Sequence, residues 1–197
     1  MRKLNILEMN RLSVDEFREA EKLPLVVVLD DVRSLHNVGS VFRTGDAFRI
    51  EAVWLCGITA TPPHNEIHKT ALGAEDSVAW RYFKTADEAV AELKRQGYTV
   101  YAVEQAEGST KLPFSPENPS SFLLPPSSKK SVAIFLGHEV KGVSQSVVDA
   151  CDGCLEIPQF GTKHSLNVSV AAGIVIWEFA RQFYSSDVLG DRDSNPE

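Results

Sequence analysis

The unbroken apolar run Leu25–Leu29 constrains the fold of this chain more than any other feature. A strand with one solvated face alternates apolar and polar residues, whereas a continuous β-branched run is typical of a strand covered on both faces. Val132–Leu136 forms a second apolar run, which also predicts a strand. Because such strands alternate with helical patterns along the chain, we expect the α/β class, with a mostly parallel sheet flanked by helices on both faces.

Local signals place the remaining elements. Ser13–Glu16 and Thr85–Glu88 have the capping-box pattern, in which Ser or Thr precedes Glu by three residues and marks a helix start. The predicted helices span 14–22, 37–48, 65–72, a segment from 86 to a cap at Gly97, and 167–184, and the predicted strands span 25–29, 52–56, 98–103 and 132–136. The segment 109–131 holds five of the ten prolines, and we expect it to be a surface excursion within one domain.

Composition limits the class of protein. The 197 residues are enough for one domain, which we place at 25–184, after a helical extension at 1–24 and before an acidic tail at 185–197 that we expect to be disordered. The net charge of −7 argues against a surface coated in positive potential, but it leaves room for a local RNA-binding patch. No apolar stretch approaches the ~20 residues that cross a bilayer. The N-terminus lacks the apolar core of a signal peptide, so we expect a cytoplasmic protein with no membrane partner.

The three cysteines do not predict a metal centre. Cys151 and Cys154 have the C-x-x-C spacing of a metal or redox site, but the chain has no second pair, and Cys56 stands alone. We expect no bound metal and small, partly buried thiols in a reducing compartment.

Three polar, glycine-containing segments follow strands: the first two follow the runs 25–29 and 132–136, and the third joins a further short strand to the last predicted helix. They read NVGSVFRT at 37–44, FLGHEVKGVS at 135–144 and IPQFGTKHSLNVSVA at 157–171. Taken alone, the third segment favours an ordinary strand-to-helix turn capped by Asn or Ser over a ligand-binding loop. Neither the G-x-G-x-x-G pattern of dinucleotide sites nor the G-x-x-x-x-G-K-[ST] pattern of phosphate loops occurs. Glycine-containing turns that follow parallel strands lie at the sheet edge where open α/β folds bind ligands.

Together, and in this order, the three segments resemble the motif set of the SpoU/TrmH family in the SPOUT superfamily, the knotted RNA ribose 2′-O-methyltransferases. The resemblance covers residues 25–184. It implies a C-terminal deep trefoil knot, S-adenosyl-L-methionine as the cofactor, an RNA substrate, and a homodimer that packs through the C-terminal helix. The combinations VEQ at 103–105, IPQ at 157–159, SLNV at 165–168 and IWE at 176–178 look like the subgroup that acts on tRNA, including the guanosine-18 enzymes.

The resemblance also assigns roles to individual residues. The cofactor would contact Glu104, Leu136, Gly137, Ile157, Ser165 and Leu166, largely through the main chain. The catalytic set would be Arg43, Asn37, Glu139 and Asn167. Candidates for RNA phosphate contacts are Arg33, Lys69, Lys141 and Lys163.

Arg43 corresponds to the family's first-motif arginine. Deprotonating an arginine at neutral pH costs roughly 7 kcal/mol, so we expect its guanidinium to orient a phosphate or the hydroxyl rather than to act as a base. Asn37 and Asn167 would hold loops or contact the ribose. Glu139 would anchor either Arg43 or the loop, and the sequence is compatible with both roles.

The last predicted helix carries two apolar stripes, although docking on its own core requires only one. The first comprises Val168, Ala171, Ala172, Val175, Ile176, Phe179 and Phe183, and the second comprises Val170, Gly173, Ile174 and Trp177. Either the helix is buried on all sides or the second stripe packs against another subunit, which the resemblance favours. Trp54, Trp80 and Trp177 lie in apolar runs, and we expect them in the core.

Three functions remain open on the sequence. The first is S-adenosylmethionine-dependent methylation of an RNA ribose, with tRNA favoured over rRNA. The second is a non-catalytic RNA-binding protein that retains the fold, and the third is an α/β enzyme with another nucleotide cofactor.

Overall fold

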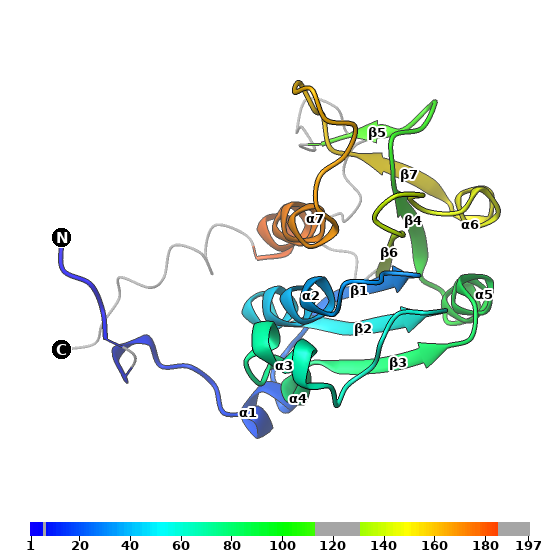
Figure 1. The fold of residues 1–197 in the computed structure, drawn as a ribbon. Helices are drawn as coiled ribbons and strands as arrows, with labels where there is room; N and C mark the ends of the chain where they lie inside the picture. The colour runs from blue at the N-terminus through cyan, green and yellow to red at the C-terminus, as the bar shows by residue number, and fades with distance from the viewer. Residues whose placement is uncertain (6, 113–130, 185–197) are drawn as a thin grey trace.

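A parallel seven-stranded sheet forms the centre of the computed structural model, which describes residues 1–5, 7–112 and 131–184 (Figure 1). The strand order is β3-β2-β1-β6-β4-β7-β5. The strands are β1 (Leu23–Asp30), β2 (Ile50–Cys56), β3 (Ala79–Phe83), β4 (Thr99–Val103), β5 (Thr110–Lys111), β6 (Val132–Leu136) and β7 (Gly153–Glu156). The predicted α/β class with a mostly parallel sheet is confirmed.

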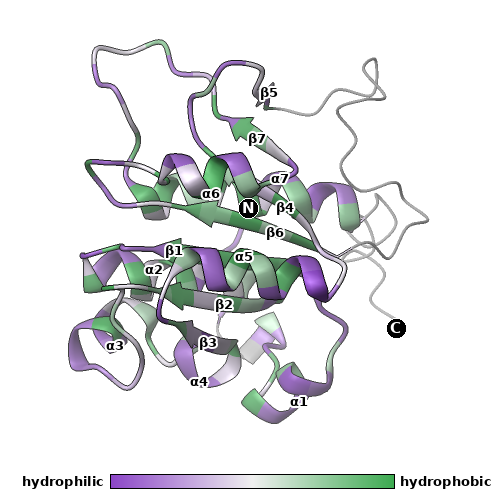
Figure 2. Ribbon diagram, turned by 90° about the vertical axis from the view of Figure 1, so that its right-hand side faces the viewer, coloured by the Kyte–Doolittle hydropathy of each residue, from purple (hydrophilic) through white to green (hydrophobic). Residues whose placement is uncertain are grey.

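Helices cover both faces of the sheet, as Figures 1 and 2 show. The helical elements are η1 (Leu7–Met9), α1 (Val14–Glu19), α2 (Leu35–Ala47), α3 (Asn65–Ala71), α4 (Ala74–Ser77), α5 (Ala86–Arg95), α6 (Gln145–Ala150) and α7 (Val168–Phe183). Alternate residues of the central strands feed two separate cores. Val27 packs with α2, α3 and α7 in one core, while Val28 packs with α5 and α6 in the other. The two apolar runs are therefore strands with both faces buried.

Both predicted capping boxes start a helix. Ser13 and Glu16 exchange hydrogen bonds as the pattern requires. Thr85 accepts from the N–H of Glu88, but the Glu88 carboxylate accepts from the N–H of Lys84 instead of closing the box. Helix α1 ends at Glu19, three residues before the predicted end. The ammonium of Lys22 donates to carbonyls at its C-terminus, which favours a helix end there.

Several elements escaped the sequence-based prediction. These are η1, β3, β5, α4 and α6, all of six residues or fewer, too short to show a clear period. The prediction that the tryptophans are core was wrong for two of them. Trp54 is 4% exposed, whereas Trp80 is 38% and Trp177 is 48% exposed. Most of the proline-rich segment and the whole acidic tail lie outside the described residues.

The late strand β6 enters the sheet between β1 and β4, and β7 then lies beyond β4. The passage of the C-terminal residues through an earlier loop stays a prediction. Within the described residues, no helix combines the length and the apolar character that a bilayer crossing needs.

Candidate active site

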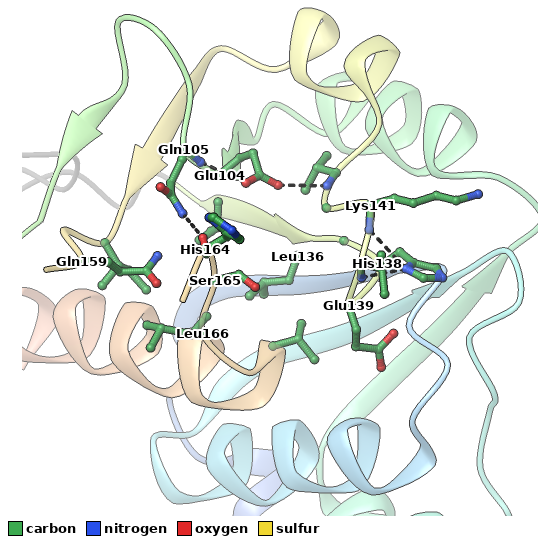
Figure 3. A pocket seen from close by; sticks show the side chains of 18 residues that line it. Glu104, Gln105, Leu136, His138, Glu139, Lys141, Gln159, His164, Ser165 and Leu166 are labelled. Carbon is green, nitrogen blue, oxygen red and sulfur yellow. Dashed lines mark hydrogen bonds between the residues drawn. The ribbon is translucent and has the colours of Figure 1, made fainter. Parts of the chain in front are cut away.

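A cavity of about 350 Å³ lies where β4, β6 and β7 end (Figure 3). Open parallel sheets commonly bind ligands at this edge. Its walls come from four stretches of chain. These are residues 103–105, residues 136–143, the pair Ile157 and Gln159, and the stretch before and into α7 that contributes residues 164, 165, 166, 168 and 171. The third motif segment and the second motif segment therefore face each other across one cavity.

All six residues predicted to contact the cofactor line this cavity. They are Glu104, Leu136, Gly137, Ile157, Ser165 and Leu166. Leu136 and Ile157 stand at the ends of β6 and β7, while Ser165 and Leu166 lie just before α7. Residues that are 62 positions apart along the chain, such as Glu104 and Leu166, thus contribute to the same small space.

The loop 137–142 folds back on itself beside the cavity. His138 and Gly142 form an antiparallel bridge. The Nδ1 atom of His138 accepts from the N–H of Val140 at 2.9 Å, so in this geometry Nδ1 is unprotonated and the proton is on Nε2. His138 therefore stabilises the fold of this loop.

Gly137 and Gly142, both in this loop, are restricted to glycine by different structural constraints. A Cβ at Gly137 would overlap with the backbone of Gly142, so the close approach of the two loop strands depends on the missing side chain. Gly142 has φ +69°, and a Cβ there would overlap with the carboxylate of Glu104. The missing side chains therefore let the loop pack on itself at Gly137 and against Glu104 at Gly142.

Glu104 and Gln105 fasten the loops around the cavity to one another. One carboxylate oxygen of Glu104 accepts from the N–H of Val143 at 3.2 Å, and the other accepts from the N–H of Gln105 at 3.0 Å. The Gln105 amide donates to the carbonyl of His164 at 2.6 Å. These bonds join the end of β4 to the second and third motif segments. In the sequence, Gln105 was noted only as part of the VEQ combination at 103–105, and no role was assigned to its side chain.

Three of the four predicted catalytic residues form a continuous hydrogen-bond chain. The Nδ2 of Asn167 donates to the Oδ1 of Asn37 at 3.1 Å, and the Nδ2 of Asn37 donates to Glu139 at 3.3 Å. Asn167 also caps α7 by accepting from the N–H groups of residues 169 and 170. This chain of hydrogen bonds joins one residue from each of the three motif segments.

Glu139 anchors backbone rather than Arg43. Its carboxylate accepts from the N–H of Ser34 at 3.0 Å and of Arg33 at 3.2 Å, in the turn that leads into α2. Partial burial by itself would raise the pKa of Glu139, but donation by Ser34, Arg33 and Asn37 outweighs it, so the pKa is lowered. Of the two roles that the sequence allowed for Glu139, the structure supports the anchoring of a loop.

Arg43 lies apart from the cavity of its own chain. Its side chain is exposed on α2, it is not among the cavity residues, and it has no hydrogen bond or ion pair within the described part of the chain. The catalytic role predicted for it stays a prediction. A guanidinium with no intramolecular partner is free to meet an anionic group from outside.

The four predicted RNA contacts are all exposed but have different neighbours. Lys141 lines the cavity, Arg33 adjoins the Glu139 anchor, and Lys163 lies in the exposed stretch before α7. Lys69 lies on α3, where its ammonium is 2.6 Å from Glu66. Nothing in the structure contradicts the predicted contacts, which stay predictions.

Burial disfavours the thiolate form of all three cysteines. Burial raises the pKa of Cys56 and Cys154 and raises that of Cys151 to about 12, and a thiolate is the form that binds metals and attacks electrophiles. Cys154 donates its S–H to the carbonyl of Glu104 at 3.3 Å. Among the described residues, no three His, Cys, Asp or Glu side chains are placed to hold a metal ion.

Comparison with known proteins gives consistent results. The model of the SpoU rRNA Methylase family matches residues 24–177. A tRNA (guanosine(18)-2′-O)-methyltransferase from Thermus thermophilus is 31% identical over 96% of this chain and 91% of its own length. A 23S rRNA (guanosine-2′-O-)-methyltransferase from Nitrosomonas europaea is 33% identical over 80% of this chain and 56% of its own length. The chain also spans 64% of a putative TrmH family tRNA/rRNA methyltransferase from Staphylococcus haemolyticus, to which it is 30% identical over 85% of its residues.

Solved structures agree with the sequence matches. An AdoMet-bound rRNA methyltransferase from Sinorhizobium meliloti superposes with a TM-score of 0.70 at 25% identity, covering 86% of this chain and 61% of that one. A TrmH/SpoU tRNA-modifying enzyme from A. aeolicus superposes over 98% of this chain and 91% of its own with a TM-score of 0.71 at 24% identity, which supports the fold. On the family match, the sequence similarity and the fold, this chain belongs to the SpoU rRNA Methylase family.

Proposed function

We propose that this protein transfers the methyl group of S-adenosylmethionine to a ribose 2′-hydroxyl of RNA. The observation that carries the proposal is the convergence of the three motif segments: two of them line one cavity, and all three are tied together through Asn37, Glu139 and Asn167. Methyltransferases of tRNA and rRNA are among the relatives, and the Sinorhizobium relative was solved with AdoMet bound.

The cavity suits such a cofactor in size and lining. About 350 Å³ lies within the range of small-molecule sites. Leu136, Ile157 and Leu166 provide apolar walls, while Ser165 and Glu104 provide polar atoms. When bound, the cofactor would supply an activated methyl group on a sulfonium, so the protein has mainly to align the acceptor and assist removal of its proton.

The protein's own residues have separable tasks in this scheme. Glu139 holds the turn before α2, Asn37 stands at the start of that helix, and Asn167 starts α7, so the three fix both helices relative to the cavity. Arg43 would orient an RNA phosphate or the attacking hydroxyl through its planar fork of donors. The proposal requires Arg43 to approach a cavity, and Arg43 is not among the residues that line the cavity of its own chain.

A homodimer would allow Arg43 of one copy to reach the cavity of the other copy. The second apolar stripe of α7 is exposed, with Val170 at 51%, Ile174 at 38% and Trp177 at 48%, whereas the first stripe packs in or against the core. Helices α2 and α7 lie side by side (Figure 1), and the rings of Phe48 and Trp177 are 5.7 Å apart. We propose that two copies pack through this stripe and that Arg43 of each copy serves the cavity of its partner.

Mixed dimers test the shared site. One protomer carries Arg43→Ala, and the other carries Gly137→Ala, which disrupts the cofactor loop. If Arg43 acts in the partner's cavity, the inactive variants regain about a quarter of wild-type activity on mixing, because half the dimers are mixed and each has one complete site. No recovery in a preparation that contains mixed dimers by light scattering and mass spectrometry would exclude a shared site.

Arg43→Ala alone tests the catalytic role. We expect methyl transfer to fall to background while calorimetry with S-adenosylhomocysteine shows unchanged affinity, and Arg43→Lys to recover little because it lacks the fork. Loss of cofactor affinity with unchanged turnover at saturation would refute the role. RNA binding without any methylated product in the wild type would instead identify a non-catalytic binding protein.

For the substrate we favour tRNA, as the motif combinations predict. The similarity to the Thermus tRNA enzyme extends over 96% of this chain, including the N-terminal extension, against 80% for the 23S rRNA enzyme. Incubation with total unmodified RNA and a labelled methyl donor, followed by mapping of the modified nucleoside, identifies the target. Label confined to ribosomal RNA would refute the preference for tRNA, and a cytoplasmic location stays a prediction.

A further inference from the structure

A second concavity, of about 450 Å³, lies at the outer edge of the sheet, away from the cofactor cavity. We call it the outer groove and define it by Pro62, Pro63, His64, Asn65, His68, Glu75, Asp76 and Trp80. It is bounded by the turn before α3, by α3, by α4 and by the start of β3, which lie together in Figure 1. None of these residues has a part in the proposed methyl transfer.

The groove presents an aromatic wall. The indole of Trp80 is 38% exposed and has no ring contact within the described residues. The exposed ring of Pro63 adds a second apolar surface. An exposed indole beside a proline, on the edge strand of a sheet, is a surface on which a planar ring can stack.

Polar groups of defined hydrogen-bonding character surround this wall. The Nδ1 of His64 accepts from the N–H of Glu66, which leaves its Nε2–H as a donor. The Nδ1 of His68 is 2.6 Å from the largely buried carboxylate of Glu75, so that carboxylate fixes the imidazole and leaves Nε2 free. The carboxylate of Asp76 is exposed and has no hydrogen bond or ion pair within the described residues.

These features suit a nucleobase better than a phosphate. The free carboxylate of Asp76 would repel a phosphate, but it can accept from the amino or imino N–H groups on a base edge. Single-stranded RNA is recognised in general by stacking of splayed bases on aromatic side chains and by hydrogen bonds to their edges. Guanine, which offers adjacent imino and amino donors, matches a carboxylate best, whereas uracil offers a single imino donor.

The position of the groove suits a nucleotide that flanks the methylated one. β3 is three strands away from β6, which corresponds to about 14 Å across the sheet. Glu66 on α3 donates its N–H to His64 of the groove, and its carboxylate bonds both His36, which precedes Asn37, and the predicted RNA contact Lys69. An RNA with its target ribose at the cavity would pass along this surface.

We propose that the outer groove binds a guanine base of the substrate RNA by stacking on Trp80 and hydrogen bonding to Asp76. The inference rests on the proposed function for the class of substrate. It adds a specificity site outside the cofactor cavity, so the enzyme would read the RNA at a second position.

The binding test uses the wild-type protein and the indole N–H signals of its three tryptophans, with the Trp80 signal assigned through Trp80→Phe. GMP should shift the Trp80 signal saturably and leave those of Trp54 and Trp177 in place, whereas UMP should bind several-fold more weakly. Asp76→Asn should remove the preference for GMP over UMP. Equal shifts with both nucleotides, no shift, or a shift with argininamide but not GMP would overturn the proposal.

The RNA test compares Trp80→Ala with Tyr82→Ala. Tyr82 is on the same strand and is 50% exposed, but it does not line the groove. We expect Trp80→Ala to weaken RNA binding by roughly tenfold, with unchanged affinity for S-adenosylhomocysteine, and Tyr82→Ala to leave both unchanged. Equal losses in the two variants would overturn the proposal. Failure of the proposed methyl transfer would appear separately, as GMP binding at Trp80 without any methylated RNA.

Discussion

Replacing Glu139 with glutamine tests the anchor that joins the second motif segment to the first. The carboxylate accepts three hydrogen bonds, from the N–H groups of Arg33 and Ser34 and from the side chain of Asn37. A glutamine has one carbonyl oxygen, so at least one of the three donors loses its acceptor and faces an amide N–H₂ instead. With the loss of charge assistance, we expect the free energy of unfolding to fall by about 2 kcal/mol.

Equilibrium urea unfolding at pH 7 measures this change. With an ordinary urea slope, about 2 kcal/mol moves the midpoint by roughly 1 M. Glu107→Gln is the matched control, since Glu107 is exposed and has no hydrogen bond within the described residues. We expect its midpoint to coincide with that of the wild type.

The pH dependence provides an independent check on the same anchor. The folded-state pKa of Glu139 is lowered from 4.5, so its stabilisation is fully present above that value and is lost as the pH falls through the folded-state pKa. The difference between wild type and Glu139→Gln should therefore shrink on acidification below about pH 4.5. Coincident midpoints at pH 7, or a difference that grows as the pH falls, would refute the anchoring role.

Three further predictions concern other parts of the fold. Gly142→Ala should weaken the binding of S-adenosylhomocysteine at least tenfold, as measured by calorimetry. The reason is that the φ of +69° and the nearby Glu104 carboxylate both disfavour a Cβ at this position. Gly161→Ala is the control and should bind normally, because a Cβ at Gly161 would meet open space. Burial raises the pKa of Asp30 to about 6. The free energy of unfolding of the wild type therefore falls as the pH rises from about 4 through 6. In thermal unfolding, Asp30→Asn should stabilise the protein by about 1 to 3 kcal/mol at pH 7 and by almost nothing at pH 4. Iodoacetamide at pH 7.5 should modify Cys151 slowly in the native protein and rapidly in urea, and equal rates would contradict its raised pKa.

Local patterns in the sequence predicted much of the architecture. The apolar run 132–136 is strand β6 with the same bounds, and the last helix was placed at 167–184 against an observed Val168–Phe183 with Asn167 as its cap. The first apolar stripe of that helix packs in or against the core and the second is exposed, as periodicity and the family resemblance together favoured. Strand and helix periods are local properties, so they can be read without knowledge of the partners.

The composition of the cavity also followed from the sequence, through the motif resemblance. All six predicted cofactor residues line it, and three of the four predicted catalytic residues, Asn37, Glu139 and Asn167, are joined by hydrogen bonds. Only the tertiary structure decided that Glu139 holds the backbone of Arg33 and Ser34 and that Gln105 ties β4 to the loop before α7. These contacts join residues that are 59 to 106 positions apart, and no local pattern encodes such a distance.

Exposure at the sheet edge was likewise decided by the tertiary structure. Trp80 lies in an apolar stretch and was predicted to be core, yet β3 is the outermost strand and leaves its indole in the outer groove. The short helix α4, next to it, has too few residues to show a period. An amino-acid sequence specifies which side chains prefer burial, but the order of strands determines which of them the fold has room to cover.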